Sequence, residues 1–256
     1  MKIRMLSNQK IKDGNLILVN AKYNYQELQN TLPALVSIPQ NVFMKQEAAV
    51  PLSALMHKIS GWNRILPVSG WRSVKEQQEI WNRSEAENGF DFTQKFVALP
   101  GHSEHQTGLA IDLAIKQASI NFICPDFPYT GIGKIFRTLT ADYGFIQRYP
   151  EKKESITGIG HEPWHFRYVG SPHASIIQKE KLTLEEYIDL IKSFPSGVHP
   201  YQYQKEKWNV SVSYLRASPG DTTDIEINPS RPYSISGNNI DGFIVTEWRD
   251  RDDNNL

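Results

Sequence analysis

The sequence predicts an α+β fold in which helices flank a central antiparallel sheet, followed by a β-rich C-terminal extension. Residues 109–115 alternate apolar and small side chains, as a strand with two different faces does. Apolar residues at helical spacing, with capping boxes, predict helices before and after this strand. After Pro195-Ser196-Gly197 short strand-like runs replace the helical pattern. We therefore expect one domain over residues 1–197 and an extension over 198–256 that packs on it.

The N-terminal half predicts short strands and two helices. We expect, in order, a strand or extended arm at 16–19, a helix at 47–59, a strand at 65–68 and a helix at 73–88. Ser73 and Glu76 form an S-x-x-E capping box at the start of the last helix, and Asn88-Gly89 ends it. A Phe-rich loop then runs to Leu99-Pro100-Gly101.

The C-terminal half continues the mixed pattern. We expect a strand at 109–115, a helix at 132–143 closed by Gly144, a strand at 164–169, and a helix at 183–191. In the extension, strand-like runs occupy 209–215, 222–227 and 242–248. The extension carries none of the chemistry described below, so we interpret it as a set of strands covering an edge of the main sheet. A substrate-binding module, or one that joins two chains in a homodimer, is the alternative.

Composition excludes several classes of function. The 256 residues hold 28 Lys and Arg against 28 Asp and Glu, and this neutral chain has no basic run for nucleic acid or a membrane surface. Cys124 is the single cysteine, so no intrachain disulfide forms, and we interpret it as a packed side chain. With no signal-peptide pattern and no apolar stretch of membrane-spanning length, the sequence predicts a cytoplasmic protein.

The segment from Ser103 to Asp112 carries the strongest chemical signal. His105 lies in a loop that leads into the strand carrying Asp112. Imidazole and carboxylate are suitable ligands for a cation such as zinc, and a carboxylate facing inward from a strand needs a partner. The alternative is a solvated loop histidine beside a buried aspartate, and these two residues alone leave both interpretations open.

A second segment, His161 to Phe166, favours the metal site. We expect a strand that begins at Trp164, with Glu162 in the loop before it and a kink at Pro163 that turns Glu162 to the side of His165. Two histidines and one aspartate leave a fourth tetrahedral position open, as catalytic zinc sites require. Glu162 would then act as the general base on a water molecule. A buried, hydrogen-bonded histidine is the alternative for this segment taken alone.

Together the two segments resemble the VanY/VanX group of D-Ala-D-Ala metallopeptidases, which share a fold with the Hedgehog-type signalling domain. The group's patterns are S-x-H-x-x-G-x-A-x-D and E-x-W-H, and the chain matches both at every position. The resemblance extends over residues 15–195. It implies one zinc ion per chain, held by His105, Asp112 and His165, with Glu162 as the catalytic base.

The resemblance also implies substrate-binding residues. An arginine of the group reaches the active site at the place of Arg72, where a guanidinium would clamp a terminal carboxylate in bidentate fashion. Gln77 lies on the first turns of the following helix, Ser103 would bond the carboxylate or amide of the substrate, and Trp164 belongs to the second pattern. Trp71 departs from the group, which usually has Tyr there, and this puts no ligand in doubt.

Within the group the chain looks closest to the VanXY type, which acts both as D,D-dipeptidase and as D,D-carboxypeptidase. That type implies action on free D-Ala-D-Ala and on soluble pentapeptide precursors, and so a role in glycopeptide resistance. Two other functions stay open: a peptidoglycan endopeptidase with the same metal site, and a non-catalytic binding module that keeps zinc. The sequence leaves the oligomeric state and the activity on D-Ala-D-Ser open.

Overall fold

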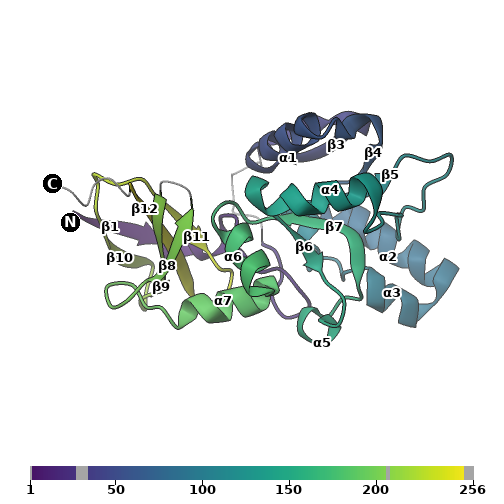
Figure 1. Cartoon of the computed structure of the whole chain (residues 1–256). Helices are drawn as coiled ribbons and strands as arrows, with labels where there is room; N and C mark the ends of the chain where they lie inside the picture. The colour runs from purple at the N-terminus through teal and green to yellow at the C-terminus, as the bar shows by residue number, and fades with distance from the viewer. Residues whose placement is uncertain (1, 27–33, 206–207, 251–256) are drawn as a thin grey trace. The chain divides into compact units, whose positions relative to one another are not determined.

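A computed structural model describes residues 2–26, 34–205 and 208–250 (Figure 1). These residues form two compact units, one with residues 2–18 and 184–250 and the other with residues 19–26 and 34–183. Antiparallel sheets and helices occur as predicted, so the α+β fold is confirmed. In the described part of the chain, no helix combines the length and the apolar character that a membrane span requires.

The larger unit is built on a four-stranded antiparallel sheet with the order β4–β5–β7–β6. Its strands are β4 (Ile65–Ser69), β5 (Ala110–Ile115), β6 (Phe145–Tyr149) and β7 (Glu162–Tyr168). The alternation predicted for β5 is confirmed, because Ile111 and Leu113 belong to the apolar core whereas Asp112 lines a pocket. The sheet therefore has one apolar face and one face that carries polar chemistry.

Helices and a hairpin surround this sheet. They are α1 (Gln46–Lys58), α2 (Val74–Asn88), α3 (Phe90–Phe96), α4 (Gly131–Thr140), α5 (Glu154–Thr157), α6 (His173–Glu180), β2 (Leu35–Ile38) and β3 (Val42–Lys45). The main core joins Leu52 and Leu55 of α1, Phe136 of α4 and Phe166 of β7, all with no exposed surface. Burying each such side chain stabilises the fold by roughly 1.5–3 kcal/mol. These core residues lie on the face of the sheet opposite Asp112, and Trp164 belongs both to the core and to the wall of the pocket.

The start of α2 is fixed by the predicted capping box. The backbone N–H of Glu76 donates to Ser73 Oγ at 3.2 Å, and the N–H of Ser73 donates to the Glu76 carboxylate at 2.8 Å. The Phe-rich loop predicted after Gly89 is wrong, because α3 forms there. A buried hydroxyl–hydroxyl contact of 2.8 Å joins Ser84 of α2 to Thr93 of α3. The local hydrophobic periodicity of the sequence does not predict this contact.

The smaller unit confirms the prediction of a β-rich C-terminal region. Its four-stranded sheet has the order β11–β12–β9–β8, and β1 pairs with β10 in a second sheet. The elements are α7 (Leu184–Lys192), β8 (Tyr201–Lys205), β9 (Trp208–Arg216), β10 (Thr222–Ile227), β11 (Tyr233–Gly237), β12 (Gly242–Asp250) and β1 (Lys2–Ser7).

The strand predicted at 16–19 does not form, although these residues are buried. The N–H of Leu16 donates to Ser236 Oγ at 2.9 Å, and that of Leu18 donates to the carbonyl of Asn238 at 3.1 Å. A side-chain hydroxyl of β11 and a carbonyl just beyond that strand therefore satisfy two backbone N–H groups that a strand ladder would otherwise pair.

The compact units divide the chain differently from the predicted boundary after residue 197. Residues 184–197 belong with the C-terminal strands because α7 packs on β9. Residues 2–7 belong there as well, since β1 pairs with β10 from Lys2–Ile227 to Ser7–Thr222. A catalytic domain over 1–197 stays a prediction.

Candidate active site

Asp112 lies between two histidines on the polar face of the sheet. β5 and β7 pair so that Asp112 is directly opposite His165. Asp112 Oδ1 is 3.0 Å from His165 Nδ1, and Oδ2 is 3.1 Å from His105 Nε2. All three side chains are buried, and one ligand atom from each lies within 4.8 Å of the others. Sequence reasoning chose these three residues, and the structure brings them together.

His105 owes its position to a short turn before β5. It lies in a 3₁₀ helix, Glu104–Thr107, which Gly108 ends at a φ of 71°. A side chain at Gly108 would be strained by this φ and would place a Cβ 3.2 Å from the backbone nitrogen of Lys45. The other ring nitrogen, Nδ1, lies 2.7 Å from the carbonyl oxygen of Gly70. Since a carbonyl only accepts, Nδ1 carries the proton and Nε2 offers a lone pair toward Asp112.

The donor set fits a divalent cation. Two imidazoles and a carboxylate suit zinc and similar ions. Asp112 Oδ1 is buried and accepts no hydrogen bond from the described residues, even though His165 Nδ1 is 3.0 Å away. A carboxylate oxygen and a ring nitrogen this close without a directed hydrogen bond are the arrangement expected where both face a common ion. The structure thus supports a metal site at His105, Asp112 and His165.

The electrostatics of the three residues are strongly coupled. Burial, with the charge of Arg72, lowers the pKa of His105 to about 4. Burial also opposes protonation of His165, but the carboxylates of Asp112 and Glu104 outweigh it and raise the pKa of His165 to about 9. Burial likewise disfavours the charge of Asp112, yet the two histidines hold its pKa well below the usual range. Without an ion the site therefore holds a proton, which a cation would displace.

Glu162 lies beside this cluster. It is the first residue of β7, so the prediction that it belongs to the preceding loop is wrong. Its predicted orientation is confirmed: Glu162 Oε2 is 3.6 Å from His165 Nδ1. In a regular strand, residues three apart face opposite sides. The β6–β7 register shifts between Gln147 and Tyr149, and this irregularity brings Glu162 and His165 to the same side of β7. Burial raises the pKa of Glu162 to about 8.

A pocket on the same face contains the four residues predicted to bind substrate. Arg72, Gln77, Ser103 and Trp164 all line it together with the three histidine and aspartate ligands and Glu162. Arg72 Nε and Gln77 Oε1 are buried and have no hydrogen-bond partner among the described residues. The Gln77 amide group donates to the carbonyl of Ala98 at 2.7 Å, which fixes its other end toward the pocket. These unsatisfied groups are suited to a polar ligand.

Comparison with known proteins agrees with this geometry. The family model for VanY, D-alanyl-D-alanine carboxypeptidase, matches residues 41–171, which is about half of the chain and includes the proposed metal ligands, Glu162 and the four predicted substrate-binding residues. The chain belongs to the VanY family. The resemblance inferred from the two sequence patterns is therefore confirmed.

Three relatives extend the comparison. The bifunctional D-Ala-D-Ala dipeptidase and carboxypeptidase VanXYC of Enterococcus gallinarum is 44% identical over 70% of this chain and 95% of its own. The crystal structure of the vancomycin resistance D,D-dipeptidase VanXYg, in complex with a D-Ala-D-Ala phosphinate analogue, has a TM-score of 0.93 at 48% identity and covers 97% of this chain and 99% of its own. The D,D-pentapeptidase VanY, a mutant in complex with Zn(II), has a TM-score of 0.55 at 30% identity and covers 68% and 98%.

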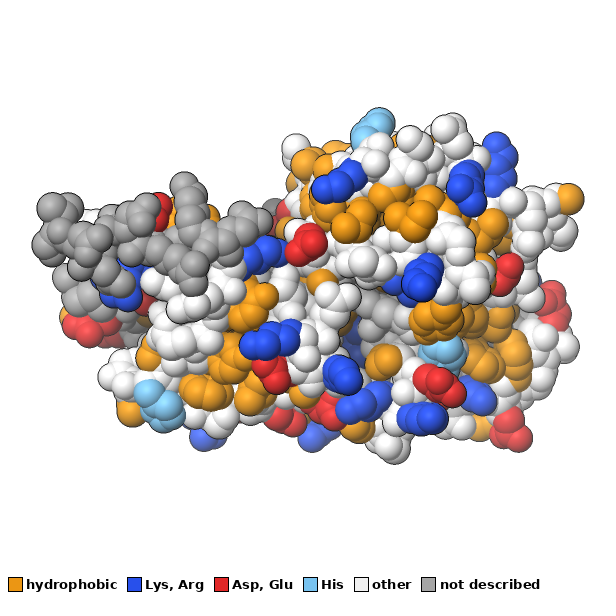
Figure 2. Space-filling model, in the orientation of Figure 1, with side chains coloured by type: hydrophobic (Ala, Val, Ile, Leu, Met, Phe, Trp, Pro, Cys, Tyr) orange, Lys and Arg blue, Asp and Glu red, His pale blue; other side chains and the backbone are white. Residues whose placement is uncertain are grey.

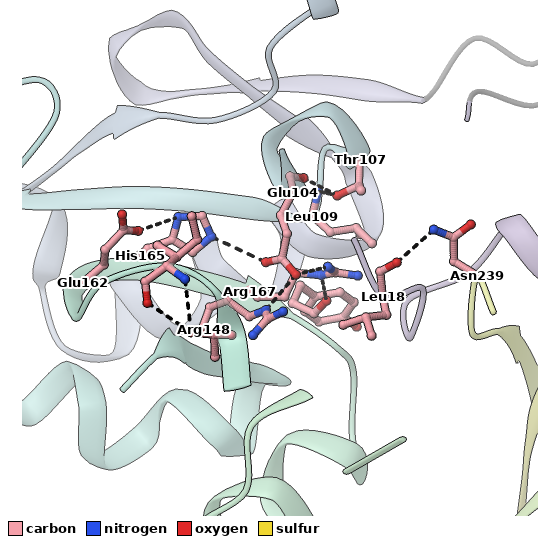
Figure 3. Close-up of polar contacts among 12 residues, drawn as sticks. Leu18, Glu104, Thr107, Leu109, Arg148, Glu162, His165, Arg167 and Asn239 are labelled. Carbon is pink, nitrogen blue, oxygen red and sulfur yellow. Dashed lines mark hydrogen bonds and ion pairs between the residues drawn. The ribbon is translucent and has the colours of Figure 1, made fainter. Parts of the chain in front are cut away.

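Sequence reasoning missed three charged residues of this VanY-family site. Glu104 is fully buried, with Oε1 2.8 Å from Arg148 Nε and 2.7 Å from Arg167 Nη1, and Oε2 3.5 Å from His165 Nε2 (Figure 3). Burial disfavours the charge of Glu104, but the two guanidinium groups hold its pKa well below the usual range. The only local signal was the position of Glu104 between Ser103 and His105, which the family pattern treats as variable.

The pocket opens beside apolar side chains. Trp164 packs 6.5 Å from the ring of Phe96, and Ile80, Val97 and Ile123 line the same pocket. On the face drawn in Figure 2, hydrophobic patches lie among scattered charged side chains and a large area of other polar side chains and backbone. The pocket itself is therefore a better candidate for the binding site than that outer face.

Proposed function

We propose that this chain is a zinc-dependent D,D-peptidase that hydrolyses the D-Ala-D-Ala bond in the free dipeptide and in soluble pentapeptide precursors, and so supports glycopeptide resistance. The observation that carries the proposal is the convergence of His105, Asp112 and His165 with Glu162, 3.6 Å from His165, in one pocket. The names of the relatives support the substrate, since VanXYC is called a dipeptidase and a carboxypeptidase.

Each residue has a role in the proposal. His105, Asp112 and His165 hold the ion; when bound, zinc polarises a carbonyl and lowers the pKa of a water molecule. Glu162 takes a proton from the attacking water and passes it to the leaving amine. A carboxylate in a buried site, with a pKa raised to about 8, binds and releases a proton near neutral pH.

The substrate's terminal carboxylate would lie against Arg72. Its buried Nε lacks a partner among the described residues, and a guanidinium can bond both oxygens of a carboxylate. Gln77 Oε1 would accept from the substrate amide, and Ser103 and Trp164 would complete the wall of the pocket. The backbone of Arg72 is held in place because its N–H donates to the carbonyl of His105, itself one of the proposed metal ligands, at 3.3 Å.

The test is release of D-Ala by the purified, zinc-loaded protein from D-Ala-D-Ala and, separately, from UDP-MurNAc-pentapeptide. Glu162→Gln is the matched variant, since it keeps the size of the side chain and removes the base. Release from both substrates that the variant loses would support the dual activity, and release from the pentapeptide alone would make the protein a carboxypeptidase. Release from neither would refute the proposal and favour the endopeptidase or the binding module. The cytoplasmic location stays a prediction for cell fractionation to test.

A further inference from the structure

Each histidine of the metal-ligand cluster has a second ring nitrogen that points away from Asp112. For His105 this nitrogen is Nδ1, 2.7 Å from the carbonyl oxygen of Gly70. For His165 it is Nε2, 3.5 Å from Oε2 of Glu104. Histidines that bind metal ions usually donate their other N–H to such an oxygen, which selects the tautomer and orients the ring. The cluster therefore has one backbone and one side-chain acceptor behind its two imidazoles.

Glu104 Oε2 and His165 Nε2 are each other's nearest candidate hydrogen-bond partners. Both atoms are buried, and neither has a hydrogen-bond partner elsewhere among the described residues. A buried polar atom without a partner costs about 1–3 kcal/mol, and more when it is charged. Because the two atoms face one another, a small shift of either side chain shortens their contact to a hydrogen bond and removes both costs.

Two buried arginines fix the direction of Glu104. Arg148 and Arg167 both donate to Oε1, so Oε2 is left for His165 (Figure 3). Glu104, Arg148 and Arg167 have no exposed side-chain surface. Arg167 lies two residues after His165 on β7 and on the same face of the strand. The Glu104 carboxylate thus lies on the Nε2 side of the His165 ring, and Glu162 lies on the Nδ1 side.

We propose that Glu104 is a positioning residue that accepts the Nε2–H of His165 and so keeps the Nδ1 lone pair directed at the ion. Arg148 and Arg167 both bond Oε1 of Glu104 and so leave Oε2 directed at His165. The inference rests on the proposed function to the extent that His165 is a metal ligand. It assigns to the buried cluster of Arg148, Glu104 and Arg167 a role in metal binding as well as in the stability of the fold.

The variant Glu104→Gln separates this role from packing. Glutamine keeps the volume but replaces one acceptor oxygen by an NH₂ group. An NH₂ group toward the arginines would face two guanidinium donors, which disfavours that orientation, so the oxygen stays with the arginines and the NH₂ group meets the Nε2–H of His165. This arrangement favours the tautomer with a proton on Nδ1, which removes the lone pair from the metal site. Loss of an acceptor of this kind weakens metal binding by about 10–100-fold.

The experiment measures the zinc dissociation constant by competition with a chelator, for the full chain, Glu104→Gln and Ser84→Ala. Ser84→Ala is the matched control because it removes a buried polar contact, the 2.8 Å contact with Thr93, in the same unit and away from the histidines. We expect weaker zinc binding in Glu104→Gln and unchanged binding in Ser84→Ala. Unchanged zinc binding in Glu104→Gln would overturn the proposal.

A second measurement needs no variant. Nitrogen-15 NMR of the zinc-loaded protein reports the protonation of each histidine nitrogen. We expect His165 to carry its proton on Nε2 and to coordinate through Nδ1, and the reverse assignment would overturn the proposal even if Glu104→Gln fails to fold. Neither readout uses D-Ala release, so a protein that binds zinc in this way but cleaves no D-Ala-D-Ala would refute the proposed function alone.

Discussion

The buried histidine of α6 predicts a specific loss of stability in acid. His173 is 5% exposed, and burial lowers its pKa to about 3. In the unfolded chain a histidine has a pKa of about 6.5. Between these two values the unfolded state binds a proton that the folded state does not, so the free energy of unfolding falls as the pH falls. The slope is about 1.4 kcal/mol per pH unit for one such group.

From pH 6.5 to pH 5 this group alone lowers the free energy of unfolding by about 2 kcal/mol. Well above pH 6.5 both states are neutral at this position, so its contribution is constant. The assay is urea unfolding at pH 7 and pH 5 of the zinc-free protein, of His173→Gln, and of His57→Gln. His57 is exposed on α1 and serves as the matched control. Other groups titrate in the same range, which is why the comparison is between variants.

Between pH 7 and pH 5 the free energy of unfolding should fall by about 2 kcal/mol less in His173→Gln than in the wild type. His57→Gln should follow the wild type. If His173→Gln and the wild type lose the same free energy between the two pH values, His173 takes up a proton in the folded state, and the reasoning from burial is refuted.

Three further predictions concern the site. Arg72→Lys removes bidentate binding, so kcat/KM for D-Ala release should fall roughly tenfold to hundredfold with unchanged zinc affinity, as steady-state kinetics and chelator competition would show. Zinc at about 100 times its dissociation constant should raise the free energy of unfolding by about 2.7 kcal/mol. The zinc-free protein should stay folded, as circular dichroism would show, because most of the apolar core packs without contact to the metal ligands. Ser73→Ala should cost about 1 kcal/mol by urea unfolding and raise KM, since the capping box fixes the residue next to Arg72.

Local patterns predicted the parts of the fold whose cause is local. The helix that Ser73 and Glu76 cap, and the alternation in β5, both follow from residues a few positions apart. The metal-ligand set was predictable because the two family patterns place its members at fixed spacing. The pairing of Asp112 with His165 then follows from an antiparallel register between β5 and β7.

Elements with a non-local cause could not be predicted. β1 pairs with β10 more than 200 residues away, so no window of sequence contains both strands. The helix α3 has three phenylalanines without a clear apolar face, and its contact with α2 decides its state. Glu104 looked like a variable position, and only the folded chain brings Arg148 and Arg167 to it.

The charges around the site bear on its selectivity. The described residues place three carboxylates and three guanidinium groups there: Glu104, Asp112, Glu162, Arg72, Arg148 and Arg167. Because Arg148 and Arg167 are both used by Glu104, Arg72 is the guanidinium that faces the pocket with an unpartnered Nε. With all six groups ionised these charges balance, so a divalent cation bound by neutral histidines leaves net positive charge, which the terminal carboxylate of a substrate offsets.

A substrate without its terminal charge should therefore be a poor one. D-Ala-D-Ala amide keeps the scissile bond but offers Arg72 no carboxylate, and a hydrogen bond to a charged group contributes about 1.5–3 kcal/mol. We expect kcat/KM for the amide to be roughly tenfold to hundredfold below that for D-Ala-D-Ala, and Arg72→Lys to narrow this difference, because the variant has already lost the bidentate contact. Equal rates of cleavage for acid and amide in the wild type would show that the carboxylate is held elsewhere or not at all.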